Sequence, residues 1–86
     1  MKKLIKEDEN ECLLKLLGEK VTIFTSGYFY TGILSGVNDV CIKLDQPSIV
    51  YETGKFSNPE WENCQSLCVD SWYINIPAIE SFGLLK

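Results

Sequence analysis

The chain has 86 residues, 45% of them hydrophobic and 23% charged, and its formal net charge is −4. This length allows one domain with a modest core, over residues 1–86, and the composition is that of a folded protein. The sequence contains no histidine, which excludes the Cys–His and Ser–His systems of nucleophilic enzymes. We therefore expect a protein that binds or assembles, with no enzymatic activity and no cofactor.

All eight basic residues are lysines. Arginine is the side chain that most often forks onto phosphates and base edges, so its absence argues against nucleic-acid binding. Single strands can still be held by stacking and by local lysine charge when the whole protein is acidic. The charge pattern therefore leaves RNA binding open.

No membrane or secretion signal is expected. Residues 21–38 carry no charge and approach the length of a membrane span, but their glycine pairs and β-branched residues are typical of a β-hairpin. The apolar stretch near the N-terminus, Leu4 and Ile5, is too short for a signal peptide, so we expect a cytoplasmic protein. We expect no metal site, and free thiols at all four cysteines: Cys12, Cys41, Cys64 and Cys68.

The first predicted element is a short helix that ends before Gly18. Asp8 is a suitable N-cap with Glu11 three residues later, which is a capping pattern. Gly18 suits the C′ position. The helix would pack through one apolar stripe, formed by Leu13, Leu16 and Leu17.

Strands follow the helix. The pattern predicts strands at 20–25 and 28–37, and glycines within the second, Gly32 and Gly36, favour strong curvature. A third strand is predicted at 40–45, where Pro47 breaks or bulges it before 49–51 continues the extended chain.

The second half of the chain is predicted to contain a long loop and two more strands. Residues 53–66 are polar and read as an exposed loop, and strands are expected at 67–76 and 78–83, separated by Pro77. Curved antiparallel strands in this order close most simply into a small barrel.

This order of elements resembles the Sm-like (LSm) family over nearly the whole chain. The resemblance implies a mostly β fold, with a short N-terminal helix followed by a strongly bent, five-stranded antiparallel SH3-like barrel of the Sm type. It rests on two stretches: Val21-Thr22-Ile23, Gly27, Gly32-Ile33-Leu34, Val37-Asn38-Asp39, Ile42 and Leu44, and then Tyr73-Ile74-Asn75-Ile76-Pro77-Ala78-Ile79-Glu80-Ser81-Phe82.

Proteins of this family assemble as rings, in which the fourth strand of one subunit pairs with the fifth strand of its neighbour. Such pairing would also protect the subunit, because apolar edge strands invite aggregation unless they are paired. A monomeric barrel with edges protected by Pro47 and Pro77 remains the alternative. The expected homo-oligomer interface comprises Cys68, Asp70, Trp72, Ile74, Ile76, Ile79 and Ser81.

Rings of this family bind single-stranded RNA at the pore, through two turns. The corresponding positions here are Val37, Asn38, Asp39, Asn75, Ile76 and Pro77. Asn75 and Pro77 stand where the family carries a basic or Arg-Gly signature, and Asn38-Asp39 is equally well explained as turn chemistry alone. Amide side chains can still form hydrogen bonds with bases.

Aromatic residues offer further contacts. Phe56 and Trp61, in the loop at 54–66, could anchor a protein partner, or Trp61 could fold back over one end of the barrel. We expect a ring that binds single-stranded RNA. The alternative is a scaffold ring that binds proteins through this loop, because negative charge accumulates with every added subunit.

Overall fold

The computed structural model describes residues 12–86. Its elements, in chain order, are α1 (Cys12–Lys15), β1 (Lys20–Thr25), β2 (Phe29–Val37), β3 (Cys41–Glu52), β4 (Asn63–Ser66), β5 (Ser71–Asn75), the 3-10 turn η1 (Ile76–Ala78) and β6 (Ile79–Gly83). The protein is mostly β, as predicted.

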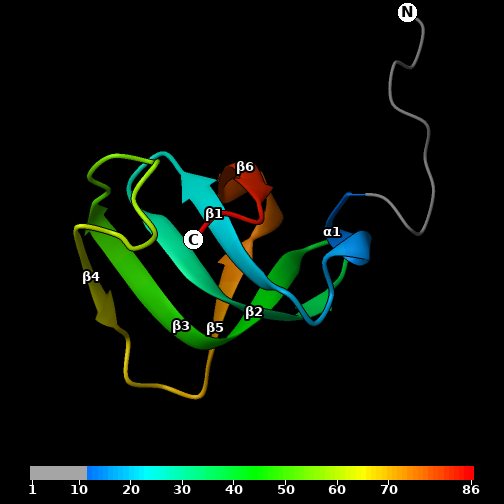
Figure 1. Cartoon of the computed structure of the whole chain (residues 1–86). Coiled ribbons are helices and arrows are strands. Elements are labelled where there is room, and N and C mark those ends of the chain that lie inside the picture. The colour runs from blue at the N-terminus through cyan, green and yellow to red at the C-terminus, as the bar shows by residue number, and fades with distance from the viewer. Residues whose placement is uncertain (1–11) are drawn as a thin grey trace, which may run out of the picture.

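The six strands form one antiparallel sheet that is not closed (Figure 1). The strand order is β4-β3-β2-β1-β6, and β5 pairs with β3 beside β4. The long strand β3 therefore pairs along one edge with two strands in succession, β5 and then β4. The first half of β3 pairs with β5, from Cys41 opposite Asn75 to Asp45 opposite Ser71, and the second half pairs with β4.

β3 bends between these two halves, at Gln46 and Pro47. The pairing with β2 shifts register here, because Ile33 lies opposite Asp45 whereas Thr31 lies opposite Ser48. Gln46 has a φ of +51°, and the Pro47 side chain is fully buried. The predicted bulge at Pro47 is thus confirmed, although the strand continues through it as one element.

The core lies inside this bend. Its buried side chains come from four strands and comprise Val21, Ile23, Leu34, Ile42, Leu44 and Ile74. Thr22 points to the opposite face of β1, away from this core. It is nevertheless buried, because the segment after β6 covers it. Its hydroxyl donates a hydrogen bond to the Leu85 carbonyl oxygen at 2.6 Å.

The helix is confirmed only in part. The proposed capping residues, Asp8 and Glu11, lie outside the described residues. Gly18 has a φ of +88°, but it lies three residues beyond the end of α1 and its N–H donates to the Leu34 carbonyl oxygen at 2.7 Å, so the predicted C′ position was wrong. Leu16 packs against the core but Leu17 remains exposed, because α1 ends at Lys15 and the helical spacing no longer applies beyond it.

Two predictions for the second half of the chain were wrong. The loop predicted at 53–66 contains a sixth strand, β4, whose four residues are all exposed. Its pairing with β3 uses the backbone, so the side chains show no apolar alternation. The strand predicted to start at 67 starts at Ser71, because the chain first crosses the bend, where Leu67 N–H donates to Pro47 O at 2.9 Å and Asp70 O accepts from Gln46 N–H at 3.2 Å.

Candidate functional site

The structure brings the two turns predicted to bind RNA side by side. The Ile76 N–H donates a hydrogen bond to the Val40 carbonyl oxygen at 2.8 Å, and Asn75 lies opposite Cys41. We call residues 38–40 and 75–78 the turn pair. Val37 and Ile76 are half-buried and pack against the core, so their main role is structural. The exposed members of the predicted site are Asn38, Asp39, Asn75 and Pro77.

Asn38 builds its own turn. Its side-chain oxygen Oδ1 accepts hydrogen bonds from the backbone N–H groups of Val40, at 2.7 Å, and Cys41, at 2.9 Å. Its backbone N–H donates to Cys41 O at 3.0 Å. The amide oxygen is therefore occupied, and only the Nδ2 group remains free to contact a ligand.

Replacing Asn38 with alanine should lower the free energy of unfolding by about 1 kcal/mol, because two backbone donors lose their acceptor. Asn38→Asp keeps an acceptor oxygen at the same place and should retain most of the stability. Urea unfolding of both variants measures the difference. Equal midpoints for the two variants would contradict this role of the side-chain oxygen.

β5 and β6 lie at edges of the sheet. Among the described residues, β6 pairs only with β1, and β5 pairs only with β3. β5, β6 and the residues just before and after them expose large apolar side chains. Tyr73 on β5 is 60% exposed, and Phe82 on β6 is 38% exposed. The other exposed apolar side chains here are Val69, Trp72 and Leu84.

The predicted interface residues divide into three groups. Trp72, on β5, is exposed, as are Cys68, Asp70 and Ser81. Ile76 and Ile79 are half-buried against the core. Ile74 is only 6% exposed and belongs to this chain's own core, so its side chain is not available to a neighbouring subunit.

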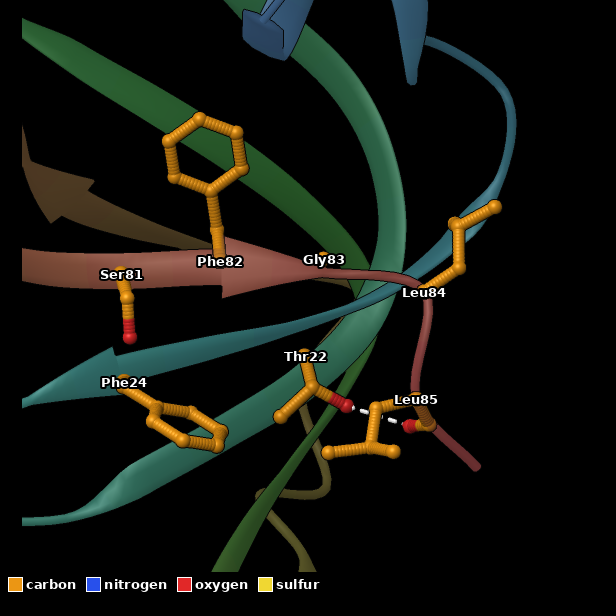
Figure 2. A pocket seen from close by; sticks show the side chains of 7 residues that line it. All are labelled: Thr22, Phe24, Ser81, Phe82, Gly83, Leu84 and Leu85. Carbon is orange, nitrogen blue, oxygen red and sulfur yellow. Dashed lines mark hydrogen bonds between the residues drawn. The ribbon is translucent and has the colours of Figure 1, made fainter.

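A shallow hollow lies on the β6 edge (Figure 2). Its volume is about 130 Å³, and β1, β6 and the following segment line it. Figure 2 shows Phe82 and Leu84 on one side of β6, and Ser81 and Leu85 on the other. This alternation is that of an extended strand. Phe82 lies opposite the buried Ile23 of β1 but is 38% exposed, and Leu84 is 57% exposed, so part of each side chain remains available for contacts with another molecule.

Asp45 fixes β5 to the sheet. Its Oδ1 accepts hydrogen bonds from the Ser71 hydroxyl at 2.8 Å and the Ser35 hydroxyl at 3.0 Å, which connects β5, β3 and β2. The Ser71 hydrogen bond, then the Ser35 hydrogen bond and the charge of Lys43, lower the pKa of Asp45, and partial desolvation opposes them. The ionised form is therefore favoured in the folded protein.

Because folding lowers the pKa of Asp45, this carboxylate stabilises the fold at pH values above the ordinary aspartate pKa of 3.8. The contribution should be lost as the pH falls below 3.8 and through the lower pKa of the folded state. Asp45→Asn should therefore show a shallower loss of urea midpoint below pH 3.8 than the unchanged protein, and Ser71→Ala an intermediate one. Parallel pH profiles for all three proteins would contradict the assignment.

The loop between β3 and β4 places Phe56 beside Trp61. The ring centroids are 6.0 Å apart and the rings meet edge to face at 87°. Phe56 is exposed and Trp61 is half-buried. The sequence did not indicate their third partner, the Lys86 ammonium, which lies 4.4 Å from the centroid of the Trp61 ring.

Neither the models of known protein families nor the sequences of characterised proteins match this chain. In residues 12–86, no group of three or more Cys, Asp or Glu side chains is placed to hold a metal ion, and no helix has the length and apolar character needed to cross a membrane. The function must therefore be argued from the strand edges and the turn pair.

Proposed function

We propose that this chain is a cytoplasmic Sm-like barrel that assembles with copies of itself into a ring and binds single-stranded RNA at the turn pair. The observation that carries the proposal is the pair of edge strands. β5 and β6 follow each other through the three residues of η1, each has one described neighbour, and both expose large apolar side chains.

Edge strands with exposed apolar side chains are a hazard in a single subunit, because their free N–H and C=O groups can template aggregation. Pairing β5 of one copy with β6 of the next would satisfy both edges. Such a contact joins two different surfaces of the subunit, so each added copy is rotated by the same angle relative to the one before it. The copies form a closed ring when a whole number of these rotations makes 360°. A homo-oligomeric ring is therefore the simplest assembly that pairs both β5 and β6, and it leaves the short, polar β4 at the edge.

Two features favour a barrel of the SH3-like type. The bend of β3 at Gln46 and Pro47 turns the sheet back on itself, and η1 carries the chain from β5, on one side of the sheet, to β6, beside β1. In this bent sheet the pairing that a closed barrel still needs is the one between β5 and β6, which the ring would supply from neighbouring subunits.

The turn pair is the part of the subunit best suited to RNA. It carries Asn38 and Asn75, both exposed, on two turns that are joined through the backbone, and a ring would repeat this place once in every subunit. The Asn75 amide makes no side-chain hydrogen bond with the described residues, so both its donor and its acceptor groups can meet base edges.

A ring that serves only as a protein scaffold is the second candidate. The Asn38 oxygen is already used within the turn, and each subunit adds a net charge of −4, which repels phosphates. The loop at 54–66, with the exposed Phe56, would then provide the contact with the protein partner.

Native mass spectrometry of the protein, purified from cells with and without nuclease, tests these proposals. A closed oligomer that loses nucleic acid after nuclease treatment supports the ring and RNA binding. A bare oligomer retains the ring and favours the scaffold, whereas a monomer contradicts both. For RNA, Asn75→Ala should weaken binding of a single strand about fivefold, the effect of one lost hydrogen bond, whereas Asn58→Ala, outside the turn pair, should not.

A further inference from the structure

The loop between β3 and β4 surrounds the ammonium group of Lys86. The Lys86 Nζ donates hydrogen bonds to three backbone carbonyl oxygens, those of Thr53 at 3.3 Å, Lys55 at 2.9 Å and Glu60 at 3.2 Å. A lysine ammonium has three N–H donors and no acceptor. The number of carbonyl oxygens therefore matches the number of donors.

Aromatic rings complete the site. The Lys86 Nζ lies 4.4 Å from the centroid of the Trp61 ring and 5.7 Å from that of Phe56. Both distances are within the range at which a cation is attracted to the face of an aromatic ring, and Trp is the strongest partner of this kind. The ammonium is thus held by carbonyl dipoles and by the electron-rich face of an indole.

The loop is preorganised by its own contacts. The Thr53 carbonyl oxygen also accepts from Glu62 N–H at 3.4 Å, and the Lys55 carbonyl oxygen accepts from Asn58 N–H at 3.1 Å. Gly54 has a φ of +65°, and a Cβ atom there would lie 3.1 Å from the Glu62 Cβ, so this position favours glycine. A site that is fixed before the ligand arrives avoids the cost of ordering it.

This arrangement distinguishes between cations. A quaternary ammonium has no N–H group to donate to the three carbonyl oxygens. The N–H groups of a guanidinium lie in one plane on separate nitrogens, so they cannot reach three oxygens that surround a single nitrogen position. A primary ammonium satisfies all three oxygens at once. A hollow of about 410 Å³ beside the site, lined in part by Pro59, Glu60 and Trp61, leaves room for a second side chain to approach.

We propose that the loop of residues 53–61 is a binding site for the primary ammonium group of lysine, and that Lys86 of the same chain fills it. While Lys86 is bound, the segment after β6 is held against the loop between β3 and β4. An external lysine side chain binds when Lys86 is displaced. This proposal does not depend on the ring or on RNA binding.

The test uses Lys86→Met, which keeps an unbranched apolar side chain and removes the ammonium. Propylammonium is titrated into the variant and into the unchanged protein, and the indole N–H signals of the two tryptophans are followed by NMR. Trp61 should shift saturably in the variant, and Trp72, on β5, serves as the internal reference. The unchanged protein should need at least tenfold more propylammonium for the same shift, because Lys86 competes.

Tetramethylammonium at the same ionic strength is the matched control ligand. It should bind the variant at least tenfold more weakly than propylammonium, because it offers no N–H donor. Equal responses to the two cations, or equal responses of the variant and the unchanged protein, would overturn the proposal.

A second measurement needs no substitution at Lys86. Brief reductive methylation of the folded protein, followed by peptide mass spectrometry, should modify Lys86 at least tenfold more slowly than the exposed Lys55. Trp61→Leu should reduce this difference, since it removes one wall of the site. Equal rates for Lys86 and Lys55 in the unchanged protein would also overturn the proposal.

Discussion

Replacing Gly32 with alanine is expected to lower the free energy of unfolding by about 2 kcal/mol and the melting temperature by roughly 8–16 °C. A Cβ atom at Gly32 would lie 3.0 Å from the Asp45 carbonyl oxygen, 3.2 Å from the Leu44 Cβ and 3.4 Å from the Pro47 Cα. These neighbours are backbone, or the first atom of a buried side chain, so they cannot rotate away. The bend of β3 would have to move instead.

Gly36→Ala is the matched control, on the same strand. A Cβ atom at Gly36 would meet only the Lys43 Cβ, at an ordinary contact distance of 3.5 Å. Its stability should change by less than about 0.5 kcal/mol. Thermal unfolding of both variants at one protein concentration makes the comparison, and equal melting temperatures would mean that β2 does not press against the bend.

The double variant Tyr73→Lys and Phe82→Lys is expected to reduce the proposed ring to single chains. If β5 and β6 pair between subunits, each contact would bury two added ammonium groups, at a cost of several kcal/mol. Each 1.4 kcal/mol weakens association tenfold, so the oligomer should be lost at micromolar concentrations. Sedimentation equilibrium measures the mass directly.

Tyr28→Lys with Tyr51→Lys provides the control for added charge. Both side chains are 52% exposed and lie together near the end of β3, away from the two edges. This control should keep the mass of the unchanged protein. Lysine at Ile74 would be a poor probe of the edge, because it would disrupt the core of the subunit itself. An unaltered mass in the edge variant would exclude pairing through β5 and β6.

The first three strands could be predicted because their apolar residues alternate. Val21 and Ile23 on β1, and Ile42 and Leu44 on β3, face the core as the pattern indicates. β4 could not be predicted in this way. Its residues, Asn63–Ser66, are polar and exposed, and only backbone pairing with the second half of β3 makes them a strand.

The positions of the two turns were predictable, but the hydrogen bonds that their side chains make were not. The sequence placed both turns of the turn pair, since Asn38-Asp39 and Pro77 interrupt apolar strands. It could not show that the Asn38 oxygen is used by the turn, because that depends on local backbone geometry. Lys86 carried no signal at all, since a single lysine has no pattern and its partners lie 26 to 33 positions earlier in the chain.

The pairing of β1 with β6 has a consequence for how the chain reaches its native state. Thr22 and Leu85, which meet through a hydrogen bond, are 63 positions apart, so β1 leaves the ribosome long before its second neighbour has been made. Closing so long a loop is entropically costly and slows folding. The face of β1 that carries Thr22 therefore stays uncovered until residues 79–85 have been made, and the growing chain depends on this late segment to cover a much earlier strand.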